Sequence, residues 1–409
     1  MGFTTQLLHS DRRYGVEHGN LLKPIHPGVT YGYEDAHDLA RVFQGKQKGY
    51  TYGRQINPTV EALQQKITQM EDGLATVAFS TGMAAIGTTL FALLRSGDHV
   101  IASKYLFGNT ASLFESFAVH GISLSFVDAT SAEGVAAAVQ PNTKLVFVET
   151  IANPRTQVSD LVGIGAVCNA NGLIYVVDNT LTTPFLFQPK SVGACLVINS
   201  LTKYIGGHGN ALGGSVTEMG RFDWTTFANI HDGYRVGEPS LWGLNQIKKK
   251  GLRDFGASLA ADSAHRLSTG ADTLALRMAR ACDNAGVIAE FFQSHDLIDQ
   301  VYYPGLPGHP QHQRTLDLFG RPGAILSIEL QAHIDCFSFL NQLQTVVKAT
   351  HLGDVRTLSI PVAHSIFYEI GPVRRAEMGI KDNLIRFSVG IEDIDDLLED
   401  FDQALSLVR

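Results

Sequence analysis

A lysine near the middle of the chain has a setting that suits covalent chemistry. Lys203 follows the apolar run 196–198 and two hydroxyl residues, and it precedes Gly206, Gly207 and Gly209. An amine confined among small residues at a ligand-binding edge is a candidate nucleophile. An isolated lysine after a strand is more often simply solvated, so this interpretation depends on other motifs.

Two further motifs follow apolar runs in the same way. Asp178 comes after the run 173–177, and a half-buried aspartate either caps a turn or pairs with a protonated ligand nitrogen. The turn 80–84 comes after the run 76–79 and opens an apolar helix, whose free N–H groups and dipole suit a phosphate. Gly82 removes the side chain that would block close approach, although an ordinary Ser/Thr cap also explains this turn.

Together, the three motifs meet the needs of one cofactor. Pyridoxal 5'-phosphate requires a lysine for covalent attachment, an acid that keeps its pyridine nitrogen protonated, and donors for its phosphate. Lys203, Asp178 and the turn at Gly82 offer these functions at strand ends. The sequence therefore predicts pyridoxal 5'-phosphate as the cofactor, and it shows no motif for a metal site.

The elements that must position these residues alternate along the chain. From about residue 75, short apolar runs alternate with helix-like segments, which is typical of an α/β fold with a mostly parallel sheet covered by helices on both faces. Ligands bind such sheets beyond the carboxyl ends of the strands. The expected strands are 76–79, 100–102, 124–127, 145–148, 173–177 and 196–198. The expected helices include 110–120 and 161–170, with Gly121 and Gly172 as caps.

Composition divides the chain into three parts. Residues 1–60 are rich in Gly, Tyr and Pro and predict an N-terminal arm that packs on a neighbouring subunit. Residues 61–247 carry the α/β pattern and form the predicted cofactor-binding domain. Residues 248–409 begin at a triple-lysine break, continue as a long helix to about 297, and end as a smaller C-terminal α+β domain.

Bulk properties exclude several classes of protein. The 409 residues are 44% hydrophobic and 18% charged, which excludes disordered, collagen-like and coiled-coil chains. A net charge of −8 argues against nucleic acid or an anionic membrane as the main partner. Four separated cysteines, no signal sequence and no apolar run of membrane-spanning length predict a cytoplasmic protein.

The segment 200–208 closely resembles the Cys/Met metabolism family of pyridoxal phosphate enzymes, the trans-sulfuration group of cystathionine γ-synthases, cystathionine and methionine γ-lyases and O-acylhomoserine sulfhydrylases. The resemblance runs from about residue 52 to 392 and implies the aspartate-aminotransferase-like fold, fold type I. It implies that Lys203 is catalytic and covalently bound to the cofactor, and that Asp178 pairs with the pyridine nitrogen. The other cofactor-binding residues it implies are Gly82, Met83, Phe107, Thr180, Ser200, Thr202, Tyr52 and Arg54.

The arm carries a motif similar to the family's Tyr-x-Arg segment. Tyr52 and Arg54 would then reach the phosphate in the neighbouring subunit, with Tyr52 also helping to transfer protons. The resemblance thus implies a dimer with shared active sites, and commonly a tetramer of two such dimers. A surface loop with a turn at 57–58 is the alternative interpretation.

Two segments resemble the family's substrate-binding motifs. In 149–154, Asn153 would lie near the substrate carboxylate, and in 383–392, Arg386 would clamp the α-carboxylate of an amino acid with its guanidinium fork. Thr350 and His351 fall in the substrate loop, where His351 replaces the usual Ser. These residues predict a small amino-acid substrate, with a thiol as its partner.

Departures from the family pattern bear on the reaction. Phe107 stands where many members have a Tyr, so ring stacking is retained but a phenol proton donor is lost. Asn109 stands where methionine γ-lyases tend to have a Cys, which favours another member of the group. His364 lies in a second divergent run, where it either contacts substrate or only packs.

The predicted reaction is γ-replacement on an O-acylhomoserine by a thiol, as in cystathionine γ-synthase. One alternative is γ- or β-elimination by a cystathionine or methionine lyase, giving a 2-oxo acid, ammonia and a thiol. The other is a pyridoxal phosphate carrier or regulatory protein without turnover, which the loss of the phenol at Phe107 suggests.

Overall fold

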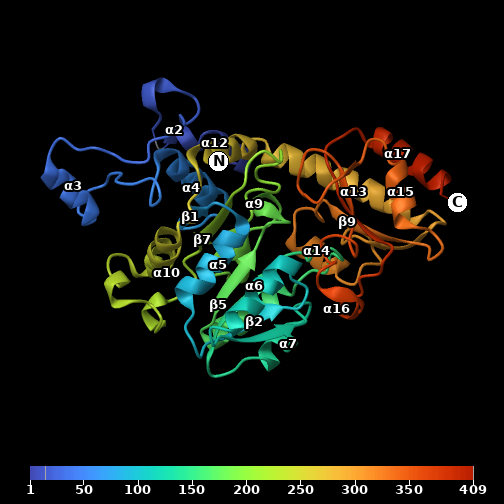
Figure 1. Ribbon diagram of the computed structural model, residues 1–409, viewed down its shortest axis with the longest axis horizontal. Coiled ribbons are helices and arrows are strands. Elements are labelled where there is room, and N and C mark those ends of the chain that lie inside the picture. Colours follow the sequence, from blue (N-terminus) through green and yellow to red (C-terminus); the bar gives the residue numbers. More distant parts are fainter. Residues whose placement is uncertain (14, 409) are drawn as a thin grey trace.

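Two β-sheets and a long helix between them organise the computed structural model, which describes residues 1–13 and 15–408 (Figure 1). The first sheet has seven strands in the order β1-β7-β6-β5-β4-β2-β3. Its strands are β1 (Ala75–Phe79), β2 (His99–Ser103), β3 (Ser123–Val127), β4 (Thr143–Glu149), β5 (Ile174–Asp178), β6 (Leu196–Asn199) and β7 (Gly214–Glu218).

The expected mostly parallel sheet is confirmed. Strands β3, β2, β4, β5 and β6 are parallel to one another, and β7 runs antiparallel to both β6 and β1. All six predicted strands are present, with ends that differ by one or two residues. Strand β7 was not predicted because Gly214, Ser215, Thr217 and Glu218 give it no apolar run, although all of these residues are buried.

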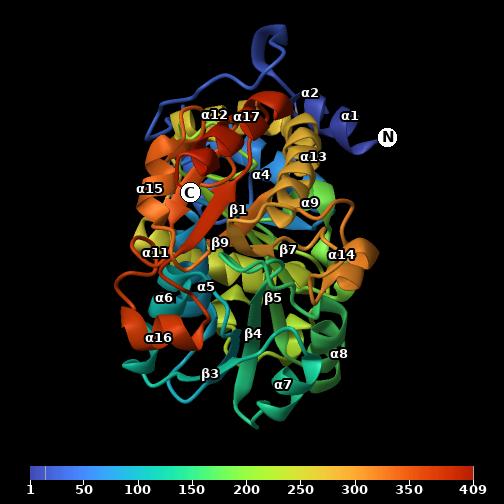
Figure 2. The same cartoon turned by 90° about the vertical axis from the view of Figure 1, so that its right-hand side faces the viewer.

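Helices cover both faces of this sheet. Figure 2 shows α5 (Gly82–Leu93) and α6 (Gly108–Ala118) to one side of β4 and β5, and α7 (Ala132–Ala137) and α8 (Leu161–Asn171) to the other. Gly172 ends α8 in the left-handed conformation, at φ 63°, as predicted for a cap. The strand ends that carry the predicted chemistry all open toward the C-terminal part of the chain.

The second sheet has five strands in the order β10-β11-β12-β9-β8. Its strands are β8 (Ile298–Tyr302), β9 (Ile325–Leu330), β10 (Val347–Lys348), β11 (Leu358–Pro361) and β12 (Leu384–Ser388). The helices around it are α14 (His312–Leu318), α15 (Cys336–Gln342), α16 (Gly371–Glu377) and α17 (Ile394–Ser406). This α+β arrangement matches the expected smaller C-terminal unit.

A long helix belongs to the cores of both sheets. In α13 (Leu274–Gln293), Met278 and Cys282 pack in the first core, whereas Ile288 and Phe292 pack in the second. The exact domain boundary at 248 therefore stays a prediction. The single helix expected from 248 to about 297 is interrupted, since a π-helix (Ile247–Leu252), α11 (Arg253–Phe255) and α12 (Ala261–Ala271) precede α13. Two short helices lie earlier in the chain, α9 (Thr183–Leu186) and α10 (Trp242–Gln246).

The first 60 residues hold little core. They contain α1 (Phe3–Leu8), α2 (Ser10–Arg13) and α3 (Ala36–Phe43), and they lead into α4 (Pro58–Met70). Helix α3 projects from the rest of the chain at the left of Figure 1 and has no buried residue. Packing of this arm on another subunit stays a prediction. Among the described helices, none has the length and apolarity needed to cross a membrane.

Candidate active site

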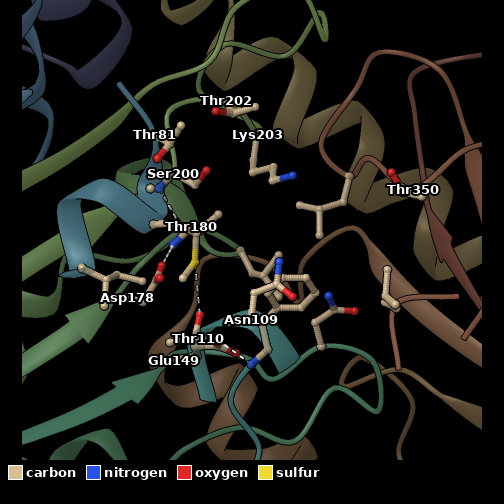
Figure 3. Close-up of a pocket in the computed structure, with 18 of the residues that line it drawn as sticks. Thr81, Asn109, Thr110, Glu149, Asp178, Thr180, Ser200, Thr202, Lys203 and Thr350 are labelled. Carbon is tan, nitrogen blue, oxygen red and sulfur yellow. Dashed lines mark hydrogen bonds between the residues drawn. The ribbon is translucent and has the colours of Figure 1, made fainter. Parts of the chain in front are cut away.

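A cavity of about 480 Å³ lies at the carboxyl ends of the parallel strands (Figure 3). Strands and loops of both parts of the chain form its walls. Its lining includes the predicted residues Gly82, Met83, Phe107, Asn153, Asp178, Thr180, Ser200, Thr202, Lys203, Thr350 and Arg386. Residues that are far apart in the sequence thus meet in one cavity.

One end of the cavity is built to bind an anion. The side chain of Thr81 caps α5 by accepting a hydrogen bond from the N–H of Ala84 at 2.9 Å, and the first turn of the helix begins at Gly82. The N–H groups of that turn need partners outside the helix. A Cβ at Gly82 would lie 2.9 Å from the Cβ of Ser200, so a larger residue would close the approach. This end fits a phosphate group.

Asp178 presents a buried carboxyl at the end of β5. Its Oδ1 accepts a hydrogen bond from the N–H of Thr180 at 2.9 Å, and the hydroxyl of Thr180 accepts one from the N–H of Ser200 at 2.8 Å. Burial raises the pKa of Asp178 above its usual value. A protonated ring nitrogen beside this carboxyl would stabilise its charged form, so the residue fits the role predicted for it.

Glu149 is a second buried carboxyl in the cavity, and sequence reasoning assigned it no role. It ends β4 as the register partner of Asp178 on β5, and its Oε1 accepts a hydrogen bond from the N–H of Phe107 at 3.0 Å. Burial, followed by the nearby charge of Asp178, raises the pKa of Glu149 to about 8. The pairing of β4 with β5, which creates this carboxyl pair, leaves no local signal in the sequence.

Lys203 points its ε-amine into the cavity (Figure 3). Burial, followed by the positive charge of Arg386, lowers the pKa of this amine to about 8. A larger share of the amine is therefore in the neutral, nucleophilic form near neutral pH than for an ordinary lysine. The nearest described hydrogen-bonding group is the imidazole Nδ1 of His351, at 3.4 Å from Nζ.

Arg386 is a buried cation on β12 with 1% of its surface exposed. Its Nη2 donates to the carbonyls of His351 at 2.9 Å and Thr350 at 3.3 Å, and its Nη1 reaches Oδ1 of Asn153 at 3.5 Å. Among the described residues, no carboxylate forms an ion pair with it, and its Nε has no hydrogen-bond partner. A buried, unpaired guanidinium favours an anionic ligand such as a carboxylate.

Three of the predicted site residues do not line this cavity. Tyr52, with 39% exposed, and Arg54 line a separate cavity of about 520 Å³ at the base of the arm. Arg54 lies with its Cζ 5.4 Å from the Tyr52 ring centroid and donates a hydrogen bond to the carbonyl of Arg253. Their contact with the cofactor of another subunit stays a prediction. His351, the third, adjoins Lys203 through its ring.

The structure also clarifies the divergent residues. Phe107 lines the cavity and offers an aromatic ring without a hydroxyl group. The phenol of Tyr105 donates a hydrogen bond to Oδ2 of Asp128 at 2.7 Å, so it is engaged elsewhere. His364 is exposed, and its Nε2 lies 3.1 Å from the carbonyl of Asp382.

The fold and the cavity together define a pyridoxal phosphate enzyme, and comparison with known proteins agrees. The profile of the Cys/Met metabolism PLP-dependent enzymes matches residues 4–406. The chain belongs to this family, its cofactor is pyridoxal 5'-phosphate, and it is an enzyme. The alternative of a carrier without turnover is therefore wrong.

Individual relatives cover nearly the whole chain. L-methionine γ-lyase of Pseudomonas putida is 36% identical over 99% of this chain and 97% of that protein. O-acetyl-L-homoserine sulfhydrylase of Corynebacterium glutamicum is 33% identical over 100% of this chain and 97% of that protein. The predicted membership of the trans-sulfuration family is confirmed.

Solved structures confirm the expected fold type I. A putative O-acetylhomoserine (thiol)-lyase from Campylobacter jejuni has a TM-score of 0.93 and 28% identity, covering 99% of this chain and 100% of that one, and it carries a pyridoxyl-lysine phosphate. A cystathionine γ-lyase from Lactobacillus plantarum has a TM-score of 0.88 and 30% identity, covering 100% of this chain and 99% of that one.

Proposed function

We propose that this enzyme catalyses γ-replacement on an O-acylhomoserine by a thiol. The observation that carries the proposal is the unpaired guanidinium of Arg386, buried in the same cavity as the Lys203 amine. This pair suits an amino acid whose carboxylate is bound at one point while its carbon chain lies near a base.

The described side chains divide the work among them. Arg386 and Asn153 would bind the α-carboxylate, Asp178 would hold the proton on the cofactor's ring nitrogen, and Phe107 would offer its ring as a stacking surface. When bound, pyridoxal phosphate supplies the electron sink that makes the α-proton of the amino acid acidic. Lys203 then removes protons from the substrate carbon chain and returns them.

The proposed reaction exchanges the acyloxy group on Cγ for the thiol sulfur. The Cγ–O bond of the O-acylhomoserine breaks and its electron pair leaves with the acyl carboxylate. The thiol sulfur forms the new Cγ–S bond, and its proton is released. The protons lost at Cα and Cβ are returned, so Lys203 ends in its starting state.

Apolar residues of the cavity support capture by a thiol. Leu212, Leu352 and Ile366 are apolar members of the lining. An apolar surface packs well against a thiol and its carbon chain, which supports replacement.

γ-Elimination is the second candidate. Several relatives, including that of P. putida, are L-methionine γ-lyases. The two reactions share the loss of the γ-group, after which either a thiol adds at Cγ or the chain takes up a proton there and is hydrolysed to a 2-oxo acid and ammonia. The C. glutamicum sulfhydrylase supports replacement to the same degree. A substrate panel decides between the two.

The subunit arrangement and the compartment are part of the proposal. Tyr52 and Arg54 lie outside the cavity of their own chain, which supports a dimer in which each arm completes the partner's phosphate site, and two such dimers would form a tetramer. The four cysteines are buried and unpaired, which supports a reducing compartment such as the cytoplasm.

The test incubates the purified enzyme with O-acetylhomoserine, O-succinylhomoserine, cystathionine and methionine, each with and without cysteine or sulfide. We expect a thioether or thiol product only when an acylhomoserine and a thiol are both present. Release of 2-oxo acid from cystathionine or methionine alone would show that the enzyme is a lyase instead.

A further inference from the structure

His351 lies behind the Lys203 amine, outside the lining of the cavity. It sits in the loop between β10 and β11, and its carbonyl accepts the hydrogen bond from Arg386 at 2.9 Å. Its imidazole Nδ1 lies 3.4 Å from Nζ of Lys203. Among the described residues, His351 is the hydrogen-bond partner of this amine, although the two residues are 148 positions apart in the sequence.

In the proposed function, the amine transfers protons only once the substrate has released it from the cofactor. A donor–acceptor distance of 3.4 Å is long for a hydrogen bond, and such contacts commonly shorten once an active site is filled. Phe107, which lines the same cavity as Lys203, has no hydroxyl that could bond to the amine. The imidazole is therefore the group available to hold the released Lys203 amine.

The surroundings of the ring favour a neutral imidazole with its proton on Nε2. Four charged groups face it, namely Lys203, Arg386 on β12, and Asp354 and Arg356 from the loop before β11. Burial, followed by the charge of Lys203, lowers the pKa of His351 to about 4, and Asp354 acts in the opposite direction. The ring is thus neutral near neutral pH.

The position of Asp354 favours a proton on Nε2. A Cβ at Gly209 would lie 2.8 Å from Oδ2 of Asp354 and 3.9 Å from Nε2 of His351, so the carboxylate and the Nε2 edge of the ring both lie near Gly209. Nε2 is buried and has no hydrogen-bond partner among the described residues. A negative charge on that side favours N–H at Nε2 and leaves the lone pair of Nδ1 facing Lys203.

We propose that His351 is a positioning residue that accepts a hydrogen bond from the released amine of Lys203 and aims it at the substrate carbons. The proposal rests on the role of Lys203 as proton carrier in the proposed function. Nδ1 can accept from both the neutral amine and the ammonium, so the contact persists while Lys203 gains and loses a proton. It binds the ammonium more strongly, because that hydrogen bond is charge-assisted.

The test uses the full-length protein freed of pyridoxal phosphate, with pyridoxal phosphate as the probe. Its covalent attachment is followed by absorbance, and the pH dependence of the rate gives the pKa of Lys203, because only the neutral amine attacks the aldehyde. His351→Leu removes the acceptor at similar bulk, whereas His351→Asn keeps an acceptor near Nδ1. His364→Leu is the control, since that imidazole is exposed and remote from the amine.

We expect His351→Leu to lower the apparent pKa of Lys203 by about one unit, because the ammonium loses its acceptor. His351→Asn should stay close to the unchanged protein, as should His364→Leu. An unchanged pKa in His351→Leu, or an equal shift in His351→Asn, overturns the proposal.

Exchange of the substrate α-proton for deuterium is the second readout. We expect about tenfold slower exchange in His351→Leu at unchanged KM, with recovery in His351→Asn, because only the aim of the amine is lost. Equal exchange rates in all variants would contradict the proposal. Both readouts are independent of the γ-carbon, so a failed substrate panel with a shifted pKa overturns only γ-replacement.

Discussion

Glu149 and Asp178 are register partners at the ends of β4 and β5, so two buried carboxyl groups share one edge of the cavity. Two adjacent carboxyls cannot both carry a charge at low cost in such a site. Asp178 is the member that faces a protonated ring nitrogen in the proposed function. Glu149 then holds a proton, and its Oε1 accepts the hydrogen bond from the N–H of Phe107.

The charge of Glu149 predicts a pH dependence of stability. Because its pKa is raised to about 8 in the folded protein, the folded state binds a proton that the unfolded state releases above about pH 4.5. This contribution to the free energy of unfolding is fully present below pH 4.5, falls as the pH rises toward 8, and then levels off. Glu149→Gln should remove it.

Urea unfolding of the cofactor-free protein at several pH values measures this effect. The quantity compared is the free energy of unfolding, in the unchanged protein and in Glu149→Gln. The difference isolates Glu149 from Glu71 and Glu218, whose pKa values burial also raises. If the free energies of unfolding of the two proteins changed in parallel across pH 5 to 8, the pKa of Glu149 would not be raised in the folded protein. Glu149→Gln still accepts from the N–H of Phe107, so the stacking loop stays in place.

Arg386 is expected to act on both the substrate and Lys203. Arg386→Leu removes the buried guanidinium, so kcat/KM for the amino acid should fall by about 100-fold or more through a higher KM. The same change should raise the pKa of Lys203, because Arg386 is one of the two causes that lower it. Initial rates and the pH profile of cofactor attachment measure the two effects.

Arg277 provides a matched control for that experiment. It is also a buried arginine, but its guanidinium donates to the carbonyls of Tyr204, Ile205 and Gly270, away from the cavity. Arg277→Leu should lower stability and leave the pKa of Lys203 in the folded protein unchanged. A higher pKa in Arg277→Leu would mean that the shift arises from general loosening of the structure.

Gly82 is expected to be indispensable for binding the cofactor phosphate. In Gly82→Ala the new Cβ would lie 2.9 Å from Cβ of Ser200, so the first turn of α5 must move away from the phosphate position. We expect the dissociation constant for pyridoxal phosphate to rise by about tenfold or more, as measured by fluorescence titration.

Gly286→Ala serves as the control for the glycine effect. Gly286 lies in α13, and a Cβ there would meet nothing within 4 Å. Alanine favours a helix over glycine by up to about 1 kcal/mol, so this variant should be as stable as the parent or more stable, with unchanged cofactor affinity. Equal affinities in both variants would remove the argument for a phosphate at Gly82.

The pattern of apolar runs predicted the sheet because strands buried on both faces are continuous apolar segments, and Lys203, Asp178 and Gly82 were found because they follow such segments. Contacts that depend on the pairing of distant elements were not predicted. The contact of Glu149 with Asp178 requires the register of β4 and β5, and that of Lys203 with His351 joins two sheets across 148 positions. Neither contact produces a local periodicity or a residue spacing in the sequence from which it could be predicted.

The proposed sharing of active sites between two subunits leads to a complementation experiment. Arg54→Ala should disable the phosphate contact that one chain makes in its partner's site, and Lys203→Ala should disable covalent attachment in its own. In a hybrid dimer both defects fall in one site, and the other site has an intact arm and an intact lysine.

Co-expression of the two variants with different affinity tags yields this hybrid dimer, and two successive purifications isolate it. Each variant alone should be almost inactive, whereas the hybrid should recover about half of the activity of the unchanged dimer, one site in two. A hybrid as inactive as its parents would show that Arg54 acts within its own chain. Because Arg54 there lies beside Tyr52 and Arg253, away from the cavity, that outcome would also require the arm to fold back toward its own Lys203.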